Sequence, residues 1–266
     1  TENATNFINP ITFETLTGNK CLVDTFDRNF QYNVEHVALA KRADLFMTAP
    51  ASANVIGKIA NGIADDMLTT TIMACKAPKL IAPAMNTNMF ENPIVQDNME
   101  KLKQYGYEII SPSTGYLACG DTGAGKLPSE ETLLSYIIKE LHYEKDMTGK
   151  KVLVTAGPTT EAIDPVRFIS NHSTGKMGYA IAKCAMERGA EVTLITGKTA
   201  IPVPPFVKMI PVISAKDMFE AVKDHFEDAD FIIKAAAVAD YTPTTVAEDK
   251  LKKNENDMNI PLVRTT

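Results

Sequence analysis

Apolar residues follow two patterns along the chain: short continuous runs, and longer stretches in which they recur every three or four positions. The continuous runs predict buried strands over residues 43–49, 79–84 and 107–111. The helical spacing predicts core-facing helices over residues 33–42 and 129–141. Buried strands that alternate with amphipathic helices are typical of a parallel sheet covered on both faces. We therefore expect an α/β fold.

The alternation stops at a polar stretch, residues 143–150, and then starts again with an apolar run over residues 151–157 that ends in glycine. Further elements are expected beyond it, namely helices over 175–188 and 215–226 and strands over 191–196 and 230–236. The chain thus predicts two tandem doubly wound domains with parallel sheets. Residues 1–145 form the first, flavodoxin-like domain, and residues 146–266 form the second, Rossmann-like domain.

Composition and charge exclude several function classes. The 266 residues carry 27 Lys and Arg against 33 Asp and Glu, a formal charge of -6, and no basic stripe, which argues against nucleic acid or an anionic membrane as a partner. The four cysteines are far apart and have neither disulfide-scaffold nor zinc-site spacing. No apolar run is long enough for a membrane helix, and the first residues have no signal-peptide layout. We expect a cytoplasmic protein that acts on small molecules.

Candidate site residues in the first half lie where ligands of open α/β sheets bind, beyond the carboxyl ends of the strands. Ser52, Ala53 and Asn54 follow the first strand at a helix start, where backbone N–H groups can bind an anion or a ring. By spacing alone, an ordinary helix N-cap is the simpler interpretation. Asn86 follows the second strand and offers a donor and an acceptor, although a turn asparagine also fits. His36 lies on a predicted helix, where a structural role is more common than a catalytic one.

A cysteine among glycines is the most unusual feature of the first half. Residues 115–127 contain four glycines around Cys119, which predicts a mobile lid over the site. A thiol in such a stretch is exposable and can act as a nucleophile or a proton donor. Cys75 and Cys184 lie in apolar helical stretches instead, where a thiol is a small hydrophobic group.

Together these features resemble the flavin-dependent cysteine decarboxylase family. Two motifs carry the resemblance, Pro83-Ala84-Met85-Asn86 with Met89, and Ala118-Cys119-Gly120 with Gly123 and Gly125. It covers residues 1 to about 142 and implies bound FMN, with which the family oxidises the terminal cysteine of a peptide-like substrate so that carbon dioxide leaves. It implies roles for single residues: His36 as base or orienting group, Asn86 as ligand of the substrate carboxylate, Cys119 as proton donor, and Ser52, Ala53, Asn54 and Ala84 as flavin contacts.

The first half departs from this family in three respects. Phe90 stands where many members have tryptophan, and Lys126 where many have arginine, so that a ring and a charge are kept. The family also opens with a strand, a loop and a helix that grip the FMN phosphate, and this chain starts after them. Roughly 40 preceding residues, about one strand-loop-helix unit and a second strand, are therefore expected in a longer chain.

The second half lacks the usual glycine motifs of nucleotide-binding proteins. No G-x-G-x-x-G follows the run at 151–157, and Met177 replaces the Ser or Thr that a P-loop needs. What remains is a glycine-rich helix start at Gly175, with Asn171 shortly before it, which can still bind phosphate through its free N–H groups. The lysines that begin at Lys250 are, by themselves, more typical of a solvated face.

In combination, however, four segments closely resemble phosphopantothenate–cysteine ligase: Asp164-Pro165-Val166-Arg167, residues 169–178, residues 236–241 and Lys250-Leu251-Lys252-Lys253. The resemblance implies that CTP, with Mg²⁺ on its triphosphate, activates 4'-phosphopantothenate as an acyl-cytidylate, which cysteine then attacks. It implies roles for single residues: Asn171 would hold the acyl-cytidylate, Lys250 would offset charge at the α-phosphate, and Lys234, Ala235, Ala236 and Asp240 would line the CTP site.

A decarboxylase followed by this ligase is typical of the bacterial bifunctional coenzyme A biosynthesis family. The combination implies that 4'-phosphopantothenate is converted through phosphopantothenoylcysteine to 4'-phosphopantetheine. A homo-oligomer is expected, because flavin sites in this family lie between subunits, and the chain is expected to stop before the C-terminal part of the ligase domain. Two alternatives stay open: a stand-alone flavin-dependent decarboxylase of peptidyl cysteines, and a non-catalytic flavin-binding regulatory subunit.

Overall fold

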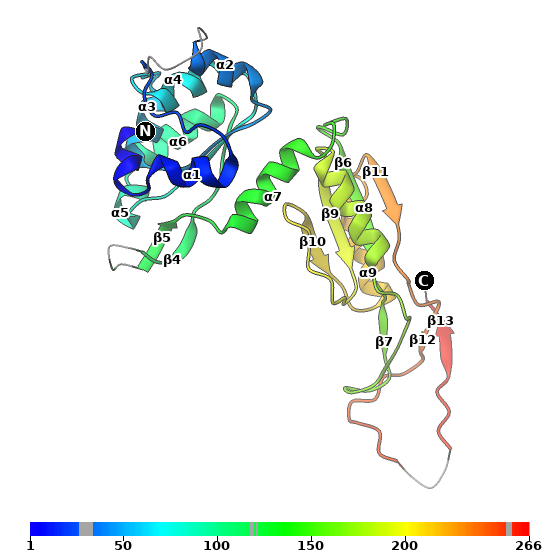
Figure 1. Ribbon diagram of the computed structural model, residues 1–266. Helices are drawn as coiled ribbons and strands as arrows, with labels where there is room; N and C mark the ends of the chain where they lie inside the picture. Colours follow the sequence, from blue (N-terminus) through cyan, green and yellow to red (C-terminus); the bar gives the residue numbers. More distant parts are fainter. Residues whose placement is uncertain (27–33, 118–119, 121, 254–256, 266) are drawn as a thin grey trace. The chain divides into compact units, whose positions relative to one another are not determined.

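The computed structural model describes residues 1–26, 34–117, 120, 122–253 and 257–265. The chain divides into two compact units, Thr1–Leu141 and His142–Thr266. Each unit has its own parallel sheet with helices packed on it, which confirms the predicted α/β class (Figure 1). The division lies slightly before the domain boundary expected between residues 145 and 146. Among the described residues, no helix combines the length and the apolar character that crossing a bilayer requires.

The first unit contains a three-stranded parallel sheet in the order β1-β2-β3. Its strands are β1 (Phe46–Ala51), β2 (Lys79–Pro83) and β3 (Tyr107–Ile109). All three predicted strands are present. The first begins three residues later than expected because Ala43 still belongs to the preceding helix as its C-cap.

Helices of the first unit cover both faces of this sheet. The helices of the unit are the 3-10 helix η1 (Glu2–Asn6), α1 (Pro10–Thr17), α2 (Glu35–Arg42), α3 (Ala53–Ala60), α4 (Met67–Ala74), α5 (Thr87–Phe90), α6 (Pro93–Gln104) and α7 (Glu130–Leu141). Ile81 packs with residues of α3, α4 and α6, whereas Leu80 and Ala82 pack with Leu133 and Ile137 of α7. Because successive side chains of a strand point to opposite faces, burial on both faces explains the continuous apolar run in β2.

The expected glycine-rich lid is largely a β-hairpin. Strand β4 (Ser113–Tyr116) pairs antiparallel with β5 (Thr122–Lys126), and Gly115 lies opposite Gly123. The described part of residues 115–127 is therefore largely paired strand and not an irregular loop, and its mobility as a lid stays a prediction. Cys119 and its neighbours 118 and 121 lie outside the described residues.

The second unit contains a four-stranded parallel sheet in the order β10-β9-β6-β11. Its strands are β6 (Lys151–Ala156), β9 (Glu191–Thr196), β10 (Lys208–Pro211) and β11 (Phe231–Lys234). The predicted strands at 151, 191 and 230 are confirmed. Strand β10 was not predicted, because it is short, follows a proline-rich stretch and itself ends in proline.

Two helices cover opposite faces of this sheet. Tyr179 and Ala182 of α8 (Lys176–Glu187) pack against Val152 and Val154, whereas Met218 of α9 (Ala215–His225) packs with Leu153. Two small antiparallel hairpins complete the unit (Figure 1), formed by β7 (Thr160–Ala162) with β8 (Phe168–Ser170) and by β12 (Tyr241–Pro243) with β13 (Leu262–Arg264).

The first residues of the second unit are held to the end of α8 by charged groups. His142 Nδ1 lies 3.0 Å from Glu187 Oε2, and Lys145 Nζ donates to the Glu187 carbonyl at 2.5 Å. Arg188 forms a two-pronged ion pair with Asp146, with Nε–Oδ1 at 2.8 Å and Nη2–Oδ2 at 2.5 Å. We call these contacts of residues 142–146 with Glu187 and Arg188 the connector network.

Candidate functional site

The loops that follow β1 and β2 meet at the carboxyl edge of the first sheet. Ala51 pairs with Pro83, and the Ala84 N–H donates to the Ala51 carbonyl at 3.0 Å. The segment Ser52–Asn54 is thereby placed beside Ala84. These four residues, which the resemblance assigns to the flavin, lie on two adjoining loops where a ligand of an α/β sheet is expected.

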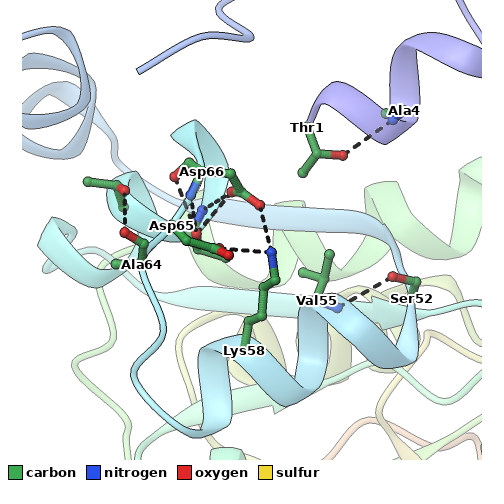
Figure 2. Close-up of polar contacts among 10 residues, drawn as sticks. Thr1, Ala4, Ser52, Val55, Lys58, Ala64, Asp65 and Asp66 are labelled. Atoms are coloured by element: carbon green, nitrogen blue, oxygen red, sulfur yellow. Dashed lines mark hydrogen bonds and ion pairs between the residues drawn. The ribbon is translucent and has the colours of Figure 1, made fainter. Parts of the chain in front are cut away.

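Ser52 is the N-cap of α3, as its spacing alone suggested. Its Oγ accepts the Val55 N–H at 3.4 Å (Figure 2). Ser52 and Asn54 are exposed, and Ala53 is half-buried. A hydroxyl that accepts one bond can still donate another, and the first N–H groups of the helix have no partner within the helix itself. The cap and an anion or ring ligand are therefore compatible.

Lys58, further along α3 than Ser52, contacts two carboxylates that lie just before α4. Lys58 Nζ contacts Asp65 at 2.8 Å and Asp66 at 3.6 Å (Figure 2). Burial raises the pKa of Asp66, but the hydrogen bonds from Thr69 and the Lys58 charge outweigh it and hold the pKa below its usual value. Asp66 therefore stays ionised at neutral pH and fixes the start of α4 through a capping box.

His36 is half-buried on α2 and lines a cavity of about 820 Å³ together with Phe26, Glu35 and Asp65. Asn86 is the N-cap of α5, and its Oδ1 accepts the Asn88 N–H at 2.9 Å. No hydrogen bond joins His36 to Asn86, although both belong to the described part of the first unit. The structure thus places the two candidate residues in the same unit without a hydrogen bond between them.

Strand β5 is packed tightly against the loop that carries Asn86. The Met85 N–H donates to the Gly125 carbonyl at 2.9 Å. Gly125 has a φ of +130°, and a Cβ built on it would lie 2.2 Å from the Met85 carbonyl oxygen. A Cβ on Gly123 would lie 2.5 Å from the Thr87 Oγ1. Both glycines are therefore required by close packing, which is a different reason from the mobility that their composition suggested.

In the second unit, the loops after β6 and β11 are joined by backbone bonds. Ala235 N–H donates to the Thr155 carbonyl at 3.1 Å, and Ala237 N–H donates to the Gly157 carbonyl at 2.9 Å. The Asn171 side-chain amide donates to the Ala237 carbonyl at 3.1 Å. Asn171 is thus held beside the segment that follows β11. This segment contains half-buried Ala235 and Ala236 and the exposed Lys234 and Asp240.

A buried threonine that the sequence did not single out ties these loops together. Thr159 is 0% exposed; its Oγ1 accepts the Ala239 N–H at 2.9 Å, and its carbonyl accepts the Ser170 hydroxyl at 2.8 Å. Nothing in the local pattern distinguishes Thr159 from other loop threonines, because both partners are distant in sequence. It bridges the two sides of the Asn171 region and fixes their spacing.

Glycines from separate segments bring the backbones of this edge together. A Cβ on Gly197 would lie 1.7 Å from the Pro158 carbonyl oxygen, and a Cβ on Gly178 would lie 2.5 Å from the Ala156 Cβ. Gly175, at the start of α8, has a φ of +77°. These glycines allow the close backbone packing that a G-x-G-x-x-G motif allows in other folds. Because they come from separate segments of the chain, they form no such motif in the sequence.

Lys250 is exposed and lies on a segment between Ala247 and Leu251 that contacts the turn of the β7–β8 hairpin. The Ala247 N–H donates to the Ile163 carbonyl at 3.0 Å, and the Leu251 N–H donates to Asp164 Oδ2 at 3.1 Å. No hydrogen bond or ion pair joins Lys250 to Asn171, so these two candidates, both within the described residues, are not in direct contact. The described residues also contain no cluster of three or more His, Cys, Asp or Glu side chains that could hold a metal ion.

Comparison with known proteins matches both halves of the chain. The family model described as "Flavoprotein" matches residues 1–142, and the model described as "DNA/pantothenate metabolism flavoprotein C-terminal domain" matches residues 147–266. The Coenzyme A biosynthesis bifunctional protein CoaBC of Bacillus subtilis is 49% identical over 270 residues, which cover 100% of this chain and 66% of that protein. The chain therefore spans about two thirds of the length of this relative.

Two further proteins extend the comparison. The protein of the same name from Borreliella burgdorferi is 43% identical, with 99% of this chain and 68% of that protein covered. A solved structure of the FMN-dependent cysteine decarboxylase SpaF is 35% identical, covers 49% of this chain and 71% of that chain, and has a TM-score of 0.42.

Proposed function

This chain belongs to the flavoprotein family that includes the coenzyme A biosynthesis bifunctional proteins, and from this premise we propose a separate activity for each unit. The first unit is an FMN-dependent phosphopantothenoylcysteine decarboxylase, and the second is the CTP-dependent phosphopantothenate–cysteine ligase that supplies its substrate. One observation carries the proposal. In each unit, some of the motif residues lie on adjoining loops at the carboxyl edge of a parallel sheet, namely residues 52–54 beside Ala84 and Asn171 beside Ala237.

The first site suits a flavin. Small residues on two adjoining loops, Ala53 and Ala84, leave the backbone open to a flat ring, and Ser52 and Asn54 add polar groups at the start of α3. When bound, FMN would oxidise the cysteinyl thiol to a thiocarbonyl, and this thiocarbonyl is the electron sink that loss of carbon dioxide requires. The chain's own residues bind and orient the substrate around it.

Asn86 is the proposed ligand of the substrate carboxylate. Its Oδ1 accepts the Asn88 N–H at 2.9 Å, which fixes the plane of the amide and directs its NH₂ group as a donor. His36 orients the reacting end of the substrate from α2, and Cys119 donates the proton to the product, as the resemblance implies.

In the second site, Asn171 is the proposed ligand of the acyl-cytidylate. The bond from its amide to the Ala237 carbonyl orients the side chain beside Lys234, Ala235, Ala236 and Asp240, which are the proposed CTP contacts. Lys250 offsets the negative charge at the α-phosphate. We assign Mg²⁺ to the triphosphate of CTP, since phosphate oxygens and water are its usual ligands.

A homo-oligomer is part of the proposal. Near the start of the chain, Phe7, Leu16 and Phe26 are 92%, 79% and 84% exposed. These three large apolar side chains are available for contact with another chain. Contact with further copies of the chain would bury them.

The test is an assay of this sequence in a chain of the relatives' full length, with 4'-phosphopantothenate, cysteine, Mg²⁺ and either CTP or ATP, and with products followed by mass. We expect the decarboxylated thiol with CTP. Decarboxylation of added phosphopantothenoylcysteine alone would favour the stand-alone decarboxylase. Flavin binding without any turnover would favour the regulatory subunit.

A pair of lysine variants tests the second unit directly. Lys250→Gln should lower pyrophosphate release from CTP by about a hundredfold or more, because it removes the charge that stabilises the transition state. Lys216→Gln, at an exposed lysine of α9, is the matched control and should leave the rate unchanged. If Lys250→Gln still released pyrophosphate at the wild-type rate, Lys250 would be a solvent-exposed lysine with no role in the reaction.

A further inference from the structure

Asp164 is an acidic side chain buried in the turn of a small hairpin. It lies between β7 and β8 and is 3% exposed. Its Oδ1 accepts the N–H groups of Val166 and Arg167, both at 2.8 Å, and its Oδ2 accepts Arg167 Nε at 2.9 Å. The turn is also closed by a backbone bond from Ile163 N–H to the Arg167 carbonyl at 2.9 Å. The turn therefore has local bonds of its own before any distant contact is counted.

The ion pair of Asp164 and Arg167 also binds Leu251, which lies 87 positions after Asp164 in the sequence. Asp164 Oδ2 accepts the Leu251 N–H at 3.1 Å, and Arg167 Nη2 donates to the Leu251 carbonyl at 2.5 Å. Both polar groups of the Leu251 backbone are thus bound by one aspartate–arginine pair. We call this arrangement of Asp164, Arg167 and Leu251 the clamp.

The clamp and one backbone bond are the main attachments of the segment that carries Lys250. Residues 244–251 form neither helix nor strand. Among the described residues, the hydrogen bonds from residues 245–253 are the Ala247 bond to the Ile163 carbonyl, at 3.0 Å, and the two bonds of Leu251. The segment is therefore fixed at residues 247 and 251, and Glu248, Asp249 and Lys250 are exposed between the two points.

Lysine has a flexible side chain of four carbons, so the place of its amine depends strongly on how well its backbone is fixed. We propose that Asp164, together with Arg167, is a positioning residue for Lys250, because the clamp fixes the backbone next to this lysine. The inference rests on the proposed ligase function of the second unit. It assigns to Asp164 a role that neither its burial nor its turn would require.

The charges around the clamp agree with this role. Arg167, Leu251, Lys252 and Lys253 line a cavity of about 800 Å³. Asp164 neutralises Arg167, and the two lysines exceed the one acidic residue of the lining, Asp257, so the cavity wall keeps a small positive charge. Burial raises the pKa of Asp164, but its hydrogen bonds and Arg167 lower it far more, so the carboxylate stays ionised at neutral pH.

The experiment compares Asp164→Asn with Asp146→Asn in a chain of the relatives' full length. Asp146 also forms a two-pronged bond with an arginine, in which its two oxygens accept from Arg188 at 2.8 and 2.5 Å, but it belongs to the connector network and not to the clamp. Hydrogen–deuterium exchange reports on residues 247–251, and steady-state kinetics with CTP separate kcat from KM. Asp164→Asn should speed exchange in this segment about tenfold. It should lower kcat ten- to a hundredfold and leave KM for CTP nearly unchanged. Asp146→Asn should change neither.

Each outcome decides one step of the inference. Unchanged exchange in a folded Asp164→Asn protein would overturn the clamp, and faster exchange with an unchanged kcat would overturn the positioning role. If Asp164→Asn does not fold, Arg167→Lys keeps the charge but loses the guanidinium bond to the Leu251 carbonyl, and the same two readouts apply. A wild-type chain without CTP-dependent turnover would overturn the proposed function and the role of Lys250, and the exchange rates would still decide whether the clamp holds the segment.

Discussion

The two candidate sites occupy the same edge of similar sheets, but their side chains are held in different ways. In the first unit, Ser52 and Asn86 each bond to a backbone N–H two or three residues away. In the second unit, Asn171 bonds to a carbonyl 66 residues away, and Leu251 bonds to a carboxylate 87 residues away. The bonds described for the first site are thus helix caps, whereas those described for the second are contacts across the unit. A substitution that loosens the fold of a unit should therefore disturb the second site more than the first.

In both sites, a glycine lies in close contact with a backbone carbonyl oxygen. Gly125 lies against Met85 in the first unit, and Gly197 lies against Pro158 in the second. The first contact attaches a hairpin to the Asn86 loop, while the second brings together two loops of the sheet edge itself. The comparison therefore predicts that single substitutions differ in how much stability or activity they remove. The following variants test this from the largest expected effect to the smallest.

Gly197→Ala should have the largest effect. A Cβ there would lie 1.7 Å from the Pro158 carbonyl oxygen, so the backbone must shift, at a cost of about 3 kcal/mol in the free energy of unfolding of the second unit. Gly149→Ala is the control, because that glycine has a φ of +76° but nothing within 4 Å, and should cost about 1 kcal/mol. Urea denaturation followed by circular dichroism measures both. Equal losses would show that the close approach is not what the glycine is needed for.

The pH dependence of unfolding should come next, and it concerns the clamp. The folded pKa of Asp164 lies well below its unfolded value, which is about 4, so the unfolded chain binds a proton that the folded chain does not. The stabilisation is therefore fully present above about pH 5 and is lost as the pH falls through and below 4. Unfolding free energies measured from pH 6 to 3 should fall more steeply for the wild type than for Asp164→Asn. Parallel curves would contradict a clamp that depends on the ionised carboxylate.

Asn86 variants separate a cap from a ligand in the first unit. Asn86→Ala removes the acceptor for the Asn88 N–H and should cost about 1 kcal/mol of stability. Asn86→Asp keeps this acceptor, so stability should change little, but it places a negative charge near the substrate carboxylate and should slow decarboxylation about a hundredfold. Denaturation and carbon dioxide release measure the two effects. Normal decarboxylation by Asn86→Asp would show that Asn86 is only a helix N-cap and not a ligand of the substrate carboxylate.

Ser52→Ala should have the smallest effect. The Oγ–Val55 bond is long, at 3.4 Å, and exposed, so its loss should cost about 0.5 kcal/mol. Flavin fluorescence titration then tests the hydroxyl as a flavin contact, with Ser129→Ala, at another exposed serine that accepts a backbone N–H three residues on, as the matched control. Equal flavin affinity in both variants would limit Ser52 to its cap.

The sequence predicted those strands that are buried on both faces, because such burial requires a continuous run of apolar residues. Strands β2, β6 and β9 are buried on both faces, and their apolar runs matched the observed positions closely. Strand β10 and the β7–β8 hairpin were not predicted, because β10 lies among prolines and β7 and β8 have at most two adjacent apolar residues.

The same contrast applies to the candidate sites. The N-cap of Ser52 could be predicted from the residue and its position alone, since cap and partner are neighbours in the chain. The partners of Asn171 and Asp164 could not, because a hydrogen bond across 66 or 87 residues leaves no periodicity to detect. Gly123 and Gly125 were noticed for their composition, but the packing that requires them became visible only in the structure.

The connector network determines where the two units can be separated or exchanged between relatives. A second unit expressed from residue 147, where its family match begins, would lose His142, Lys145 and Asp146. Of the ion pairs that the described residues offer the Glu187 carboxylate, which is 4% exposed, Lys183 at 3.8 Å would remain. A gene for the second unit should therefore begin at His142, and chimaeras with a foreign first unit should be joined at or before Leu141, so that the ion pairs stay with the half they stabilise.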